Sequence, residues 1–261
     1  MSGLGSVFET CRAESRAALI GYLPAGFPTV EGSRDVLRTM VSAGCDVVEV
    51  GLPFSDPVMD GPTIQRAAEQ ALRGGFRVRD LFGVVESVTS AGGRAVVMTY
   101  WNPVLAYGVD RFARDLAAAG GLGVITPDLV PDEAEEWIAA SDAHDLDRIF
   151  LVAPSSSEER VAMTARSSRG FLYATSVMGV TGARDVVSSA APALVERVRA
   201  HTDLPVGVGL GVRNGAQAAE LAAFADGVIV GSAFVSAVAD DSVAALTEEL
   251  AGGVRRAAAA V

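Results

Sequence analysis

The chain has 261 residues, of which 50% are apolar and 20% are charged, so it has enough apolar residues for a substantial core and is not a disordered chain. Its 21 basic and 32 acidic residues give a net charge of −11 without any Lys/Arg-rich run, which argues against nucleic acid or an anionic membrane as a partner. The length fits one large domain, and we expect residues 1–261 to form a single domain.

The first residues do not have the pattern of a secretory signal, and no run of about 18 uninterrupted apolar residues follows. We therefore expect a cytoplasmic protein. Cys11 and Cys45 do not have the spacing of metal ligands, and we expect no metal site and two buried, reduced thiols. A disulfide or a reactive thiol is the alternative.

The spacing of Leu4, Val7, Phe8 and Cys11 predicts an amphipathic helix at the start of the chain. Eight strand-like runs follow, beginning at Ala17, Asp46, Arg94, Gly121, Asp147, Gly170, Pro205 and Asp226. Segments of helical period lie between them. Eight β/α units in about 250 residues predict an α/β fold, a (β/α)₈ TIM barrel with an extra N-terminal helix. A doubly wound open sheet is the alternative, but the GxGxxG turn expected after its first strand is missing.

The connections after the second and the sixth predicted strands are the longest. The first holds a loop and two predicted helices, and the second contains the sequence GVTGAR at residues 179–184. In a barrel both lie on the catalytic face, where long loops indicate a lid or a partner site.

Glu49 lies inside the second strand, where Val47, Glu49 and Gly51 share one face and Val48 and Val50 share the other. It is the only acid that we find within the core of a predicted strand, and we find no basic residue in another strand core to pair with it. Burial should raise its pKa, which suits a general acid/base. A structural ion pair is the alternative.

Asp60 precedes Gly61-Pro62, which predicts a helix start, so Asp60 is either a structural residue of that start or a functional residue beside Glu49. Asp56 fits a turn together with a contact to another protein. Tyr173, in the sixth strand, fits either an aromatic pocket or ordinary barrel packing. Tyr22 and Tyr100 end the first and third strands and could wall the same site.

The seventh strand ends in GVGLG at residues 207–211 and the eighth in VGSA at residues 230–233. Both runs could open onto helix N-termini, where backbone N–H groups bind anions, and barrels commonly bind phosphate after these strands. A phosphate monoester is the expected ligand. Close backbone packing is the alternative.

With these residues placed, the chain closely resembles the tryptophan synthase alpha subunit family over essentially its whole length. The matching segments are VEVGLPFSDPVMDGPTIQ, TYWNPVLAYG, ITPDLVPDEA, FLVAPSSS, GVTGAR, GVGLGVR and GSAFV. The resemblance implies cleavage of indole-3-glycerol phosphate to indole and glyceraldehyde 3-phosphate, a retro-aldol reaction without a cofactor in this chain.

The resemblance also assigns roles to residues. It implies that Glu49 is the general acid/base and that Asp60 accepts the hydrogen bond of the indole N–H. It implies substrate contacts for Tyr173 and Thr181, and we expect Tyr22 and Tyr100 to join them. The implied phosphate contacts are Gly182, Gly211, Gly231 and Ser232.

The family further implies a partner. The loops after the second and sixth strands, with Asp56 and Pro57 in the first, should dock on a beta subunit in an alpha₂beta₂ complex. Pyridoxal phosphate is then expected in that beta subunit. Two alternatives remain, a stand-alone indole-releasing lyase and a mainly non-catalytic chain that activates a beta subunit.

Overall fold

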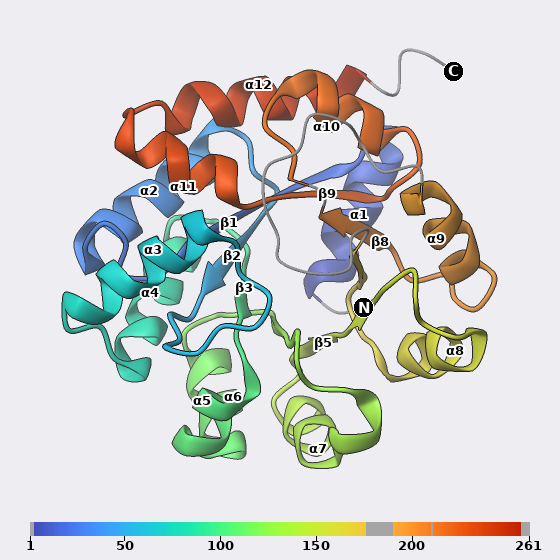
Figure 1. The fold of residues 1–261 in the computed structure, drawn as a ribbon, viewed down its shortest axis with the longest axis horizontal. Coiled ribbons are helices and arrows are strands. Elements are labelled where there is room, and N and C mark those ends of the chain that lie inside the picture. Colours follow the sequence, from blue (N-terminus) through green and yellow to red (C-terminus); the bar gives the residue numbers. More distant parts are fainter. Residues whose placement is uncertain (1–2, 176–189, 210, 257–261) are drawn as a thin grey trace.

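Parallel strands form the centre of the molecule and helices surround them, in a computed structural model that describes residues 3–175, 190–209 and 211–256 (Figure 1). The strands are β1 (Ala18–Pro24), β2 (Val47–Gly51), β3 (Ala95–Met98), β4 (Gly123–Ile125), β5 (Asp147–Ile149), β6 (Leu151–Val152), β7 (Leu172–Thr175), β8 (Val206–Gly209) and β9 (Gly227–Val230). In the described residues they form one sheet in the order β5-β4-β3-β2-β1-β9-β8-β7-β6.

The two ends of this sheet are joined by the chain itself. β5 pairs with β4, β6 pairs with β7, and only Phe150 separates β5 from β6. The amide of Tyr173 donates to the carbonyl oxygen of Phe150 at 3.2 Å. The predicted barrel is therefore confirmed, with one difference: the fifth predicted strand is interrupted and counts as two.

Helices alternate with the strands. They are α1 (Gly3–Ala13), α2 (Val30–Ala43), α3 (Pro62–Arg73), α4 (Val78–Ser90), α5 (Trp101–Tyr107), α6 (Val109–Ala118), the 3₁₀ turn η1 (Pro131–Glu133), α7 (Glu135–Ala143), α8 (Glu158–Ser167), α9 (Ala190–Arg199), α10 (Gly215–Ala222), α11 (Ser232–Ala239) and α12 (Val243–Arg256). Local signals start several of them, such as the Thr29 hydroxyl that accepts from the Gly32 amide at 3.0 Å. None of the described helices is long and apolar enough to span a membrane.

The long connection predicted after the second strand is confirmed, since the loop 52–61, α3 and α4 all lie between β2 and β3. The long connection after the sixth predicted strand follows β7, and its residues 176–189 lie outside the described residues.

Helix α1 closes one end of the barrel interior. Leu4, Phe8 and neighbouring apolar residues of α1 pack against inward-facing strand residues such as Val47, and the rings of Phe8 and Phe171 are 5.5 Å apart. Val47 lies at the start of β2 and Glu49 lies two residues further along the same face. The interior is therefore filled from its amino-terminal end, and Glu49 is on the side of the opposite end, where the loops that follow the strands meet.

Two predictions about the strand cores are wrong. Asp147, the first residue of β5, is also fully buried, and Arg148 follows it in the same strand. Arg148, however, donates to Ser141 Oγ at 2.9 Å and to the Ser167 carbonyl at 3.0 Å, and these residues belong to α7 and α8. Because its guanidinium group points to the helices outside the barrel, it is not an ion-pair partner of Glu49.

Candidate active site

Glu49 is buried in the middle of β2, with an exposed fraction of 1%. Its Cα partners across the sheet are Tyr22 in β1 and Val96 in β3. The predicted facing is confirmed, because Val47 packs inside the barrel whereas Val48 and Val50 belong to the layer between strands and helices. Among the described residues, Glu49 Oε1 has no hydrogen-bond partner. A buried carboxyl oxygen in this state is available to a ligand.

Burial raises the pKa of Glu49 to about 8. The side chain therefore carries a proton at neutral pH, and it can both donate and accept one close to that pH. This is the electrostatic property expected of a general acid/base.

Asp60 lies in the loop between β2 and α3 and is half-buried. Gly61, and not Asp60, is the N-cap of α3, and the cap makes no side-chain hydrogen bond. The backbone carbonyl of Asp60 instead accepts from Gln65 Nε2 at 2.8 Å. The Asp60 carboxylate therefore does not cap the helix, which favours the functional role over the structural one.

Tyr100, the N-cap of α5, joins this loop to the next strand connection. Its hydroxyl donates to the Asp60 carboxylate and accepts from the Met59 amide at 3.0 Å, and its ring lies 5.3 Å from that of Phe54. Burial raises the pKa of Asp60, and the Tyr100 hydrogen bond opposes that shift. Burial, followed by the charge of Asp60, raises the pKa of Tyr100 to about 12. Sequence patterns do not reveal the contacts of Tyr100 with Asp60 and Phe54, since the partners are forty or more residues apart.

Tyr22 and Tyr173 reach the same region from β1 and β7. Burial raises the pKa of each hydroxyl well above the ordinary 10, and the charges of Asp60 and Glu49 raise both further. Tyr173 also packs against the inner core. The two predicted tyrosines thus lie close enough to both acids for the acids' charges to raise their pKa values. One site is therefore formed by β1, β2, β7 and the loop after β2.

The glycine-rich strand ends differ from each other. Gly231 is the N-cap of α11, and Ser232 is its first residue. Gly211 has a φ of +67°, which favours glycine, but α10 begins only at Gly215. The run after β9 therefore leads directly into α11, whereas residues 212–214 lie between Gly211 and α10. Thr181 and Gly182 lie outside the described residues.

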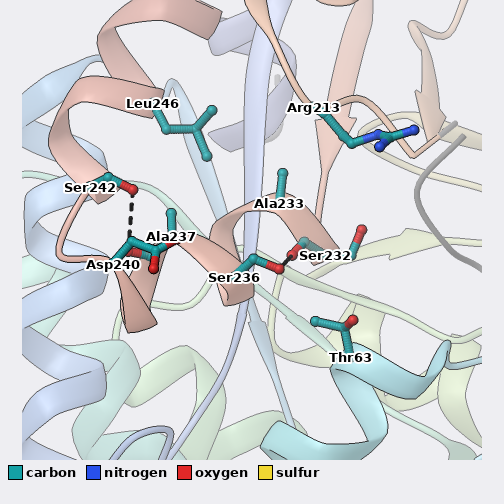
Figure 2. A pocket seen from close by; sticks show the side chains of 9 residues that line it. All are labelled: Thr63, Arg213, Ser232, Ala233, Ser236, Ala237, Asp240, Ser242 and Leu246. Carbon is teal, nitrogen blue, oxygen red and sulfur yellow. Dashed lines mark hydrogen bonds between the residues drawn. The ribbon is translucent and has the colours of Figure 1, made fainter. Parts of the chain in front are cut away.

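A pocket of about 300 Å³ lies beside Ser232 (Figure 2). Its lining residues are Thr63, Arg213, Ser232, Ala233, Ser236, Ala237, Asp240, Ser242 and Leu246. Ser236 Oγ donates to the Ser232 carbonyl at 3.0 Å. In Figure 2 the guanidinium group of Arg213 points away from Asp240. Hydroxyl groups, the apolar side chains of two alanines and a leucine, one cationic side chain and one acidic side chain therefore line this pocket along α11.

The loop after β2 is exposed where the sequence predicts a partner contact. Asp56 is exposed and accepts from Ser55 Oγ at 2.6 Å, Pro57 is partly exposed, and Val58 is 70% exposed. The predicted turn at Asp56 agrees with the bend there. No cluster of His, Cys, Asp or Glu that could bind a metal ion occurs among the residues that the structure describes.

Comparisons with known proteins agree on one family. The family model for the tryptophan synthase alpha chain matches residues 8–259. The tryptophan synthase alpha chain of Nocardia farcinica is 70% identical over 99% of this chain and 98% of its own length, and that of Mycobacterium marinum is 68% identical over 98% and 96%. A solved structure of Mycobacterium tuberculosis tryptophan synthase superposes with a TM-score of 0.95 at 66% identity, covering 97% of this chain and 98% of that one. The alpha subunit from Legionella pneumophila superposes with a TM-score of 0.85 at 31% identity, covering 100% of both chains.

Proposed function

The chain belongs to the tryptophan synthase alpha chain family, which cleaves indole-3-glycerol phosphate in tryptophan biosynthesis, and we propose how its own residues carry out that cleavage. The observation that carries the proposal is the buried carboxyl group of Glu49, which has an unpartnered oxygen and a pKa raised by burial to about 8. An acid that is protonated at neutral pH fits the first step of a retro-aldol reaction on an indole ring.

In this mechanism Glu49 donates its proton to the ring carbon that bears the glycerol phosphate side chain. The ring becomes an indolenine cation, which is the electron sink. The Glu49 carboxylate then takes the proton of the adjacent hydroxyl group while the carbon–carbon bond breaks and its electron pair returns to the ring. Indole and glyceraldehyde 3-phosphate result, and Glu49 ends protonated as it began.

Asp60 accepts the hydrogen bond of the ring N–H and stabilises the positive charge of the cation. The negative charge of Asp60 stabilises the transition state more than the bound substrate, because the positive charge on the ring develops there. The Tyr100 hydroxyl, which donates to Asp60, favours the ionised carboxylate that this role needs. Tyr22, Tyr100 and Tyr173 border the indole, and Thr181 helps to close the site.

The phosphate group binds at the other side of the mouth, to Gly182, Gly211, Gly231 and Ser232. The first amides of α11 follow Gly231, and a helix N-terminus favours an anion. These backbone donors explain how a chain with a net charge of −11 can bind a phosphate ester.

Release of indole from indole-3-glycerol phosphate tests the assignment of Glu49. Glu49→Gln should fold and lose at least roughly 10²-fold in kcat, the typical contribution of a general acid/base. The matched control is Glu9→Gln, because Glu9 is an exposed acid of α1. Near-normal turnover of Glu49→Gln would remove this residue from the mechanism.

The chain acts together with a beta subunit that contains pyridoxal phosphate, in an alpha₂beta₂ complex in the cytoplasm. Three large apolar residues support a docking face: Val58 is 70% exposed, Leu105 51% and Val130 42%. They lie in the connections after β2, β3 and β4, which are neighbouring strands. Asp56 and Pro57 belong to the same face, whose exposed apolar residues are typical of an interaction site.

Titration with a beta subunit tests this face. Val58→Asp should weaken binding by at least about tenfold, because a charge replaces an apolar contact. Thr10→Asp, at an exposed position of α1 at the closed end of the barrel, is the control and should bind normally.

Indole release, measured with and without the beta subunit, separates the alternatives. Equal turnover with and without the beta subunit would identify a stand-alone lyase. A complex in which indole-3-glycerol phosphate is not cleaved, while beta activity rises, would identify a non-catalytic activator.

A further inference from the structure

Gly51 lies two residues after Glu49 on the same face of β2, where the backbone does not require glycine. Its φ is not in the left-handed region, and it pairs with Pro24 in β1 and Met98 in β3 as an ordinary strand residue. A glycine inside a strand weakens it unless another group approaches the backbone closely. The reason for this glycine therefore lies in what packs on it.

The ring of Tyr22 packs on Gly51. A Cβ atom at position 51 would be 2.4 Å from Tyr22 Oη and 2.6 Å from both Cζ and Cε2, distances at which something must shift. On its other side the ring approaches Gly231, where a Cβ atom would lie at an ordinary 3.6 Å from Tyr22 Cδ1. The phenol thus spans from the end of β9 across β1 to β2.

This placement sets the surroundings of Glu49. Tyr22 and Glu49 are Cα partners, so their side chains leave the sheet on the same side, and the tip of Tyr22 crosses to the residue that follows Glu49 on that face. Because Gly51 is nearer to the ends of the strands than Glu49, the phenol lies on the mouth side of the carboxyl group. Glu49 is 1% exposed although it faces an open end of the barrel.

We infer that Gly51 is a positioning residue, whose missing side chain lets the Tyr22 ring lie across β2 and shield the Glu49 carboxyl group from water. The inference rests on the proposed role of Glu49 as the proton donor. It adds that Gly51 and Tyr22 act as a pair, and that Tyr22 does so without giving or taking a proton.

The titratable side chains around Glu49 fit this role. Tyr22 from β1, Asp60 from the loop after β2, Tyr100 from the start of α5 and Tyr173 from β7 are the neighbouring groups in the described residues. Burial raises the pKa of Tyr22 well above 10, so the phenol stays neutral. Since burial is also what raises the pKa of Glu49, a shield that moves aside should return this pKa toward its ordinary value.

The pH dependence of kcat/KM for indole-3-glycerol phosphate tests the pair. If protonated Glu49 is the active form, wild-type kcat/KM falls above about pH 8. Gly51→Ala displaces the ring and Tyr22→Leu removes it. In both variants the fall of kcat/KM at high pH, the alkaline limb of the profile, should move to lower pH. Both should also reduce kcat/KM by roughly 10–100-fold. Tyr22→Phe is not a substitute for Tyr22→Leu, because Cζ and Cε2 would still collide with the new Cβ atom.

The double variant Gly51→Ala with Tyr22→Leu is the decisive comparison. It should be no worse than Tyr22→Leu alone, because the new methyl group enters space that the ring has left. Likewise, Gly51→Ala should lower the free energy of unfolding of the wild-type chain but not of Tyr22→Leu. Gly83→Ala in α4 is the control, since its Cβ atom would meet only the far end of the Arg34 side chain. It should leave the pH profile of kcat/KM unchanged and should not lower the free energy of unfolding, because alanine favours a helix more than glycine does.

Additive effects of the two substitutions, or an alkaline limb that stays in place in Tyr22→Leu, would overturn the inference. If Gly51→Ala did not fold, the pH profile of kcat/KM for Tyr22→Leu would still test the inference. A failure of the proposed function looks different, because Glu49→Gln would then retain turnover in the wild-type background.

Discussion

Glu49 is 1% exposed, so folding moves its carboxyl group from water into the barrel. The protonated form tolerates this transfer better than the carboxylate does. The unfolded chain loses the proton near an ordinary pKa of 4.5, whereas the folded chain retains it up to about pH 8. Between these two pH values the folded state binds more protons than the unfolded state, so the free energy of unfolding decreases as pH rises.

This sign gives a prediction for Glu49→Gln. The wild-type chain should lose about 1.4 kcal/mol of stability per pH unit above pH 4.5, or about 3 kcal/mol by pH 7, relative to a variant without the titrating group. Urea unfolding of both proteins from pH 4.5 to pH 9 measures the difference, which should level off above pH 8. The exposed acid Glu9 provides the control, Glu9→Gln. Parallel stability curves for wild type and Glu49→Gln would show that the folded protein does not raise this pKa.

At the scale of elements, the two acids lie on different kinds of structure, one on a strand and the other on a loop. Glu49 is on a strand that is paired on both sides, whereas Asp60 is on the loop between β2 and α3. Side-chain contacts from Tyr100 and Gln65 are what restrain this loop beside the acid. Asp60 is therefore hydrogen-bonded to a residue at the start of α5, an element that begins after β3.

Tyr100→Phe should consequently reduce kcat/KM by roughly 10–100-fold, because a small displacement of a charged group at the reacting ring is costly. The loss of a hydroxyl group that bonds both Met59 and Asp60 should lower the free energy of unfolding by only about 1–3 kcal/mol. Tyr107→Phe is the matched control, since the Tyr107 hydroxyl donates to Asp115 at 2.6 Å on the outside of the barrel. If both variants kept full kcat/KM, Tyr100 would not position Asp60.

At the scale of the whole molecule, the types of charged residue and the net charge both bear on the reaction. All 21 basic residues are arginines, so the chain contains no lysine that could form a Schiff base with a carbonyl substrate. In the mechanism proposed above, the protonated indole ring takes the place of a Schiff base as the electron sink. The same chain has a net charge of −11, so a phosphate ester approaches against the overall field.

Ionic strength should therefore increase kcat/KM for indole-3-glycerol phosphate. Salt screens the long-range repulsion more than the contacts in the site, and we expect a rise of roughly twofold to fivefold between about 10 mM and 150 mM salt. Indole is uncharged, and its KM in the reverse condensation is the control that should not change. A fall in kcat/KM with salt would mean that attraction by local cationic groups governs binding.

The sequence by itself determined the repeating β/α units, the helix at the start of the chain and the inward face of Glu49. These features depend on neighbouring residues, because side-chain alternation and helical period are properties of a local segment. The family motif likewise placed Asp60 in a loop beside the site. That residues 1–261 form a single domain stays a prediction.

Only the tertiary structure decided which side chains meet. Met59 and Tyr100 are 41 residues apart, Tyr22 reaches Gly51 from another strand, and Arg148 points outward although its strand reads as buried. The fifth predicted strand is also interrupted at Phe150. No local pattern encodes such contacts, since they arise when parallel strands of fixed register bring distant residues to the same end of one barrel.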